Sequence, residues 1–136
     1  KEGFEMNRTK KETKKETASE GVPVDLDNKG VGPITSVTFD DTVNEEMAAA
    51  GKEKFEAICT ACHMAEQRMI GPALKGVYER RSPEWVMNMI LNPEEMVIND
   101  PIAKDLLIKF NGAPMANQNL DEDQARAILE YFRTLD

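Results

Sequence analysis

The sequence predicts an all-α domain. Helix start and stop signals become frequent after residue 41, and no run of alternating apolar and polar residues indicates a competing strand. At 136 residues the chain fits one domain. A fold of this size buries only about two thirds of its unfolded surface, so we expect something besides side chains to help hold its core.

The charge of the chain limits its partners. It has 17 Lys+Arg against 25 Asp+Glu, a net charge of −8, and no basic stripe, which argues against a nucleic-acid binder. No apolar run of about 18 residues predicts a membrane span, and the chain does not open with an apolar secretory segment. We expect either a trimmed extracytoplasmic protein or a cytosolic one.

The composition predicts three regions. Residues 1–20 are dense in Lys, Glu and Thr, which predicts a flexible charged leader or tether, with a short charged helix as the alternative. Residues 21–41 have Gly and Pro at turn spacing, which predicts an extended segment packed on the domain. Its expected apolar anchors are Ile34, Val37 and Phe39. Residues 42–136 form the helical domain.

The first helix is expected through residues 44–62. Asp41 or Thr42 can cap it, and Glu45 and Glu46 in its first turn favour the helix dipole. This helix would deliver both cysteines of the chain.

Further helices follow at similar signals. A short helix is expected at residues 73–80. Ser82 and Pro83 then begin a helix that ends near Asn92, before Pro93.

Two more helices complete the domain. Asp100 and Pro101 begin the first, and Asn111 with Gly112 stops it. The last helix occupies residues 120–136, where Asp121 and Gln124 have capping-box spacing. Its apolar stripe consists of Ile128, Leu129, Phe132 and Leu135.

One short motif, CTACH at residues 59–63, contains both cysteines and the single histidine. A thioredoxin-like redox pair would need a helix N-terminus and a βαβ pattern, whereas this pair lies at the end of a predicted helix. A structural zinc site would need a second knuckle of ligands, which the chain lacks. A pair of buried cysteines beside a surface histidine is the remaining simple interpretation.

The adjacent histidine favours a fourth interpretation. In a helical segment Cys59, Cys62 and His63 project to one side. Two thiols so placed can add to the vinyl groups of one porphyrin while the imidazole binds its iron, and CxxCH is the attachment motif of c-type haem.

Residues 47–135 resemble the class I cytochromes c. GKEKFEAICTACH resembles that family's first helix and haem motif, IGPALKGVYERRSPEW the segment after the haem, and LDEDQARAILEYFRTL the closing helix. The resemblance implies about four to five helices around one haem c with its iron, bound covalently through Cys59 and Cys62. It also implies that one porphyrin edge is exposed.

The resemblance assigns roles to several matched residues. His63 would bind the iron through Nε2, and the carbonyl of Pro72 would accept the Nδ1 hydrogen and orient the ring. Leu74 would contact the macrocycle. Gly51 and Phe55 on the first helix would cross the aromatic residues Tyr131 and Phe132 on the last helix.

The second axial ligand is expected to be Met115. A single histidine excludes bis-histidine ligation within the chain. Met115 stands in the loop NGAPMANQNLDED, where the family has its ligand methionine, although Ala116 replaces a proline frequent there. Lys109 and an open iron are the competitors. The other seven methionines are expected to pack in the core, and among them Met87 and Met89 fall on a predicted helix.

Four further residues are candidates for the haem propionates. Trp85 and Tyr78 have a polar hydrogen that needs a partner when buried, which a propionate or any carbonyl can supply. Arg80 and Arg81 either pair with propionates or form a solvated surface.

The expected function is one-electron transfer by a monomer in the periplasm or another extracytoplasmic compartment, with a possible membrane tether through the leader. The redox partner would be a terminal reductase or oxidase. SPEWVMNMILNPEEM and PMANQN resemble cytochromes associated with nitrous oxide reductase, while a quinol-oxidising complex fits equally. The alternatives are a haem sensor or enzyme with a displaceable Met115, and an electron-input module of a larger reductase.

Overall fold

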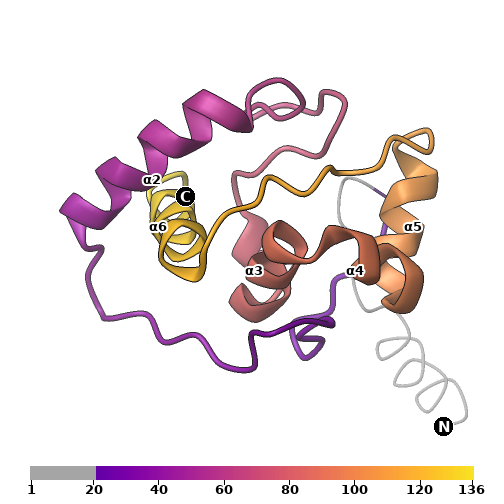
Figure 1. Cartoon of the computed structure of the whole chain (residues 1–136), viewed down its shortest axis with the longest axis horizontal. Helices are drawn as coiled ribbons and strands as arrows, with labels where there is room; N and C mark the ends of the chain where they lie inside the picture. Colours follow the sequence, from indigo (N-terminus) through magenta and orange to yellow (C-terminus); the bar gives the residue numbers. More distant parts are fainter. Residues whose placement is uncertain (1–20) are drawn as a thin grey trace, which may run out of the picture.

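The computed structural model describes residues 21–136, so the leader expected at residues 1–20 lies outside the described part of the chain. Five α-helices and one 3₁₀ helix make up its regular structure, and residues 21–136 form no β-strand beyond isolated bridges. The all-α prediction is confirmed. The elements in Figure 1 are α2 (Glu45–Ile58), η1 (Val77–Glu79), α3 (Pro83–Leu91), α4 (Pro93–Asn99), α5 (Pro101–Lys109) and α6 (Glu122–Arg133).

The first and last helices cross each other at close range (Figure 1). Gly51 of α2 is buried against α6, and a Cβ there would collide with the backbone carbonyl of Ala127. One turn later the ring of Phe55 contacts those of Tyr131 and Phe132, with centroids 5.4 and 5.8 Å apart. The expected crossing is therefore present, and the glycine is what lets the two backbones meet.

The start of α2 differs from the expectation that Asp41 or Thr42 caps it. Asn44 is the N-cap, and its side-chain oxygen accepts a hydrogen bond from the Met47 N–H at 3.0 Å. The N–H of Asn44 donates to Glu130 of α6 at 2.7 Å. This tertiary bond fixes the chain at Asn44, so the helix begins there rather than two or three residues earlier.

Helices α3, α4 and α5 follow one another almost without linkers, and each has a proline in its first turn. The starts at Ser82 and Asp100 are confirmed, since each side chain caps its helix. Helix α4 was not expected, because Pro93 was interpreted only as the end of α3. The helix expected at residues 73–80 is shorter than predicted and reduces to η1.

Residues 21–44 contain no helix and lie along the outside of α3 and α6 (Figure 1). Ile34 is buried, and Val37 and Phe39 are half-buried against the core. The amide of Asn88, on α3, donates to the carbonyls of Lys29 and Ile34 and accepts the Ile34 N–H. The segment is thus bonded to α3 through its backbone.

The carboxylate of Asp100 joins three parts of the fold. It is 2 % exposed, and it accepts hydrogen bonds from Asn28 in the N-terminal segment, from the indole of Trp85 in α3 and from the Ala103 N–H in α5. Three donors on one buried carboxylate compensate for its desolvation. None of the helices between residues 21 and 136 has the length and apolarity needed to cross a bilayer.

Candidate functional site

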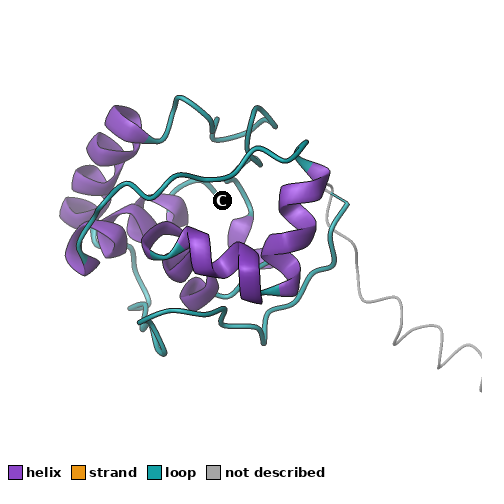
Figure 2. Ribbon diagram, turned by 45° about the vertical axis from the view of Figure 1, so that its right-hand side comes forward, coloured by secondary structure: helices purple, strands orange, loops and turns teal. Residues whose placement is uncertain are grey.

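A large apolar cavity lies between the loop that follows α2, helices α3 and α5, and the loop that precedes α6. Its volume is about 390 Å³, within the range of pockets that enclose a cofactor. Figure 2 shows how long loops pass across the helices. All six residues predicted for the site line this cavity: Cys59, Cys62, His63, Pro72, Leu74 and Met115.

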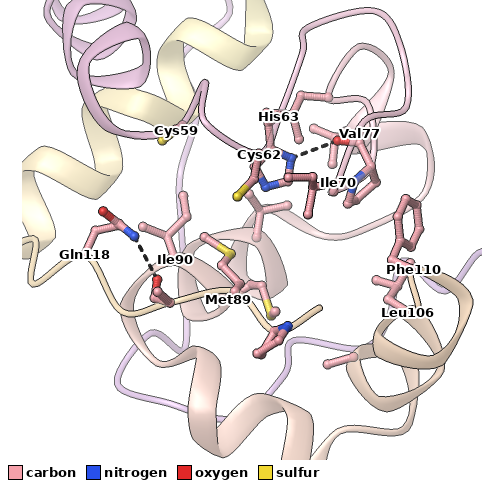
Figure 3. Close-up of a pocket in the computed structure, with 18 of the residues that line it drawn as sticks. Cys59, Cys62, His63, Ile70, Val77, Met89, Ile90, Leu106, Phe110 and Gln118 are labelled. Atoms are coloured by element: carbon pink, nitrogen blue, oxygen red, sulfur yellow. Dashed lines mark hydrogen bonds between the residues drawn. The ribbon is translucent and has the colours of Figure 1, made fainter. Parts of the chain in front are cut away.

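The cysteines and the histidine lie in a single turn that continues from α2. The helix ends at Ile58, directly before the motif, and not at Cys62 within the motif as expected. The carbonyl of Cys59 accepts hydrogen bonds from the N–H groups of Cys62 and His63, at 3.2 and 3.0 Å. This helical hydrogen bonding places Cys59, Cys62 and His63 on one wall of the cavity (Figure 3).

The imidazole of His63 is held from two sides. Its Nδ1–H donates to the carbonyl of Pro72 at 2.9 Å, the contact that the resemblance implied. Because a carbonyl can only accept, this bond fixes the tautomer and leaves the lone pair on Nε2, which faces the cavity in Figure 3. Gly71 lies against the ring, where an added Cβ would come within 2.6 Å of Cε1. The Gly71 N–H also donates to Cys62, which closes the loop.

Burial sets the protonation of these groups. It lowers the pKa of His63, and the bond to Pro72 offsets only part of that effect, so the ring stays neutral and its Nε2 can act as a ligand. Desolvation, followed by the neighbouring Cys62, raises the pKa of Cys59 to about 11. A raised pKa keeps the thiol protonated, and this argues against a reactive redox pair, because such a pair needs a thiolate. Residues 21–136 contain no group of three or more His, Cys, Asp or Glu side chains arranged to hold a metal ion.

The two remaining predicted residues come from separate loops. Leu74 is buried at the cavity wall beside η1, and Met115 is half-buried in the loop between α5 and α6. Met89 was assigned to core packing because it lies on a helix, yet it also lines the cavity. The helical periodicity of α3 contained the missing signal, since Val86, Met89 and Ile90 share one face and all three line the cavity.

The four propionate candidates have protein partners. The Trp85 indole donates to Asp100 at 2.9 Å, and the Tyr78 hydroxyl donates to the Leu129 carbonyl at 2.8 Å, so both donors are satisfied without a propionate. Arg80 donates to the carbonyl of Ala73 and Arg81 to that of Pro23. Both arginines line the cavity, so the prediction that they pair with the haem propionates stays a prediction.

The donor set and the shape of the cavity fit one group. The walls are mainly aliphatic and aromatic, with Leu106 and Phe110 across from the motif in Figure 3. Two thiols and a neutral imidazole stand together on one wall. A large flat apolar molecule attached through sulfur, with a metal that accepts an imidazole nitrogen, satisfies these features together.

Comparisons with known proteins agree with this fit. The family profile described as cytochrome c matches residues 48–136. A cytochrome c from Rhodothermus marinus is 41% identical, with a TM-score of 0.74 over 76% of this chain and 89% of that chain. An engineered form of that protein, solved with a bound carbene intermediate, is 40% identical, with a TM-score of 0.70 over 76% of this chain and 89% of its own.

A more distant structure has the same fold. The cytochrome c domain of the pp3183 protein from Pseudomonas putida is 28% identical, with a TM-score of 0.57 over 62% of this chain and 85% of that domain's chain. No curated protein sequence matches. The family match extends over well more than half of the chain and includes the cavity and its CxxCH motif. The chain therefore belongs to the cytochrome c family, as a class I member whose cofactor is a covalently bound haem c.

Proposed function

We propose that this electron carrier exchanges single electrons with a terminal reductase or oxidase outside the cytoplasm. The observation that carries the proposal is the meeting of His63, two thiols and a cavity-lining methionine in one apolar cavity. Haem c, when bound, supplies an iron that alternates between the ferrous and ferric states. His63 and Met115 would together occupy the ligand positions that the porphyrin leaves free, which favours electron transfer over binding of a substrate.

Each side chain has a distinct task in this proposal. Cys59 and Cys62 hold the porphyrin covalently, and His63 binds the iron through Nε2 while Pro72 keeps its ring oriented. Met115 would hold the iron from the loop between α5 and α6, and its thioether would raise the reduction potential relative to harder ligands. Leu74 and its apolar neighbours exclude water from the cavity. When water is excluded, little solvent has to reorganise around the iron as its charge changes.

The proposed place of electron exchange is the edge of the cavity beside Cys62. Cys62 is exposed, and the nearby Ile70 both lines the cavity and is 51 % exposed. Met64 and Met69 are exposed in the same loop. This apolar edge on an acidic chain suits a small and short-lived contact with a partner that presents basic residues around its own redox centre.

The partner and compartment belong to the proposal as well. Maturation of haem c outside the cytoplasm supports a periplasmic or similar location. Residues 82–96 and 114–119 resemble cytochromes of nitrous oxide reduction, so that reductase is one candidate partner, and a terminal oxidase or a quinol-oxidising complex fits equally well. Electron input to a larger reductase is compatible with the same site.

Rapid mixing of the reduced holoprotein with purified candidate partners tests this proposal. We expect a second-order electron transfer whose rate falls as salt is raised, because the net charge of −8 attracts a basic docking surface. A reversible one-electron titration of the holoprotein serves as the control. The proposed partners are wrong if the titration is reversible but no candidate partner accepts electrons from this protein faster than it accepts them from an unrelated acidic cytochrome.

A further inference from the structure

Two methionines line the cavity, although only one of them was expected there. Among the described residues Met89 of α3 and Met115 of the loop before α6 are the methionines that contribute to its wall. Figure 3 places Met89 across the cavity from His63. The neighbouring Met87 and Met96 are buried elsewhere in the core, at 4 % and 0 % exposed. Two thioethers therefore face the space in which the haem iron needs one.

Met89 is held in place by its helix. Helix α3 begins at a Ser82 cap and contains Asn88, which is 1 % exposed and makes three hydrogen bonds to residues 29 and 34. Val86 and Ile90 lie on the same face as Met89 and line the cavity with it. The backbone of Met89 thus cannot withdraw unless α3 separates from the N-terminal segment.

Met115 has much weaker local support. Within the described part of the chain, side-chain and backbone hydrogen bonds of residues 114–119 join them only to one another, as from Gln118 to Ala116 and from Asn119 to Asn117. Pro114 and Ala116, on either side of Met115, are exposed. A segment with few buried contacts and no bonds to the scaffold opens at a low free-energy cost.

We propose that Met89 is a second thioether ligand for the haem iron, which takes the axial position when the loop withdraws Met115. The proposal rests on the proposed function, in which Met115 is the resident ligand. The exchange breaks one iron–sulfur bond and forms another, with no electron or proton transferred. Because both donors are soft thioethers, the iron keeps its ligand type and stays closed to small molecules.

Four holoprotein variants test this inference: the wild type, Met115→Leu, Met89→Leu and the double variant. Leucine preserves apolar volume but cannot ligate. The readouts are the far-red absorption band of the ferric thioether complex and the upfield methyl resonance of a ligated methionine in the ferrous state. We expect Met115→Leu to retain both signals at shifted positions, Met89→Leu to match the wild type, and the double variant to lose both. Met115→Leu combined with Met87→Leu, a buried residue of the same helix outside the cavity, should behave like Met115→Leu alone.

The outcomes separate this inference from the function beneath it. Loss of both signals in Met115→Leu would show that Met89 only packs, and would leave the electron-carrier proposal intact. Loss of both signals in Met89→Leu alone would make Met89 the resident ligand, which overturns the exchange as stated. A wild type that shows neither signal and binds carbon monoxide at once would instead refute thioether ligation, and the proposed function with it.

Discussion

Gly71 has no side chain, and this lets its backbone lie directly against the His63 ring. The residue lies against the His63 ring and donates its N–H to Cys62, so the loop from Cys62 to Pro72 folds tightly over the imidazole. The Pro72 carbonyl can then reach Nδ1 at 2.9 Å. Gly71 thus allows the close approach through which the Pro72 carbonyl fixes the tautomer of the proposed iron ligand.

Gly71→Ala should therefore disturb the imidazole. A Cβ 2.6 Å from Cε1 forces the ring or the loop to move, which we expect to cost about 1–3 kcal/mol of unfolding free energy and to weaken the bond to Pro72. Nitrogen NMR of the His63 ring measures the change. Gly76→Ala is the control, since its φ of +74° makes alanine strained but its neighbours lie at 3.6 Å or more and do not include His63. An unaltered His63 signal in Gly71→Ala would contradict the assigned contact.

Glu130 is the most buried charge in α6. Its carboxylate, 1 % exposed, contacts Arg126 at 2.7 Å and Arg133 at 2.8 Å and accepts the Asn44 N–H. Desolvation alone would raise its pKa, but these hydrogen bonds and charges outweigh it, so the pKa of Glu130 lies below its usual range. The carboxylate thus joins the N-terminus of α2 to α6.

Glu130→Gln tests this junction through its pH dependence. A depressed pKa stabilises the fold above the ordinary glutamate pKa of about 4.3, and the gain disappears as pH falls through the lower folded value. We expect the variant to lose about 1.5–3 kcal/mol of unfolding free energy at neutral pH. The difference in unfolding free energy between variant and wild type should narrow as the pH falls below the ordinary glutamate pKa. Urea unfolding at several pH values measures it. A difference that does not change with pH would show that packing, and not charge, accounts for the loss.

At the scale of elements, the crossing of α2 and α6 is the junction on which the motif depends, because Cys59 follows directly from α2. Gly51→Ala should loosen it. Alanine improves helix propensity by about 1 kcal/mol, yet its Cβ collides with the Ala127 carbonyl, so we expect a net loss of about 1–3 kcal/mol. Thermal unfolding of the holoprotein provides the measurement. Ala50→Ser, on the exposed surface of the same helix, should stay within about 0.5 kcal/mol. Equal effects from the two substitutions would refute the close approach.

Local signals predicted the elements better than their tertiary use. The Asp121–Gln124 capping box and the prolines after Ser82 and Asp100 act on neighbours a few residues away, so the sequence alone identified those helix starts. Pro93 likewise begins α4, but this proline was interpreted only as the end signal of α3, so α4 was not predicted. Asn44 also has a local capping signal, since asparagine is a favoured N-cap residue, but the bond from its N–H to Glu130, 86 residues later, is one that no local pattern could indicate.

In the candidate site, too, the local motif was predicted from the sequence, and several tertiary contacts were not. Both thiols and the imidazole belong to one five-residue motif, so the sequence alone indicated Cys59, Cys62 and His63 as candidates, and the structure places all three at the cavity. The position of Met89 requires knowing which face of α3 turns toward the cavity. The donors of Trp85 and Tyr78 are bonded to Asp100 and Leu129, partners that only the folded chain brings near.

At the scale of the whole molecule, the haem cavity separates the crossing of α2 and α6 from α5. Its wall includes Phe55, Trp85, Leu106, Phe110 and Ile128. Without the haem, these apolar side chains would face an unfilled cavity in a chain that already has a small core.

Expression without haem maturation should therefore give a loosened protein. We expect retained helical far-ultraviolet dichroism, a weakened near-ultraviolet signal, binding of a hydrophobic dye and loss of a sharp unfolding transition. The matured holoprotein, prepared from the same chain, is the reference. A cooperative transition at the holoprotein midpoint would show that the protein chain alone fills its core.

The proposed electron carrier needs an iron whose ligands all come from the porphyrin and from side chains of this protein, whereas a sensor or an enzyme would keep an open ligand position. The most direct measurement is stopped-flow mixing of the ferrous, full-length holoprotein with carbon monoxide. We expect a slow reaction whose rate becomes independent of carbon monoxide concentration, because a thioether would first have to leave the iron. A fast reaction whose rate rises in proportion to carbon monoxide would show an open iron and refute electron transfer as the function.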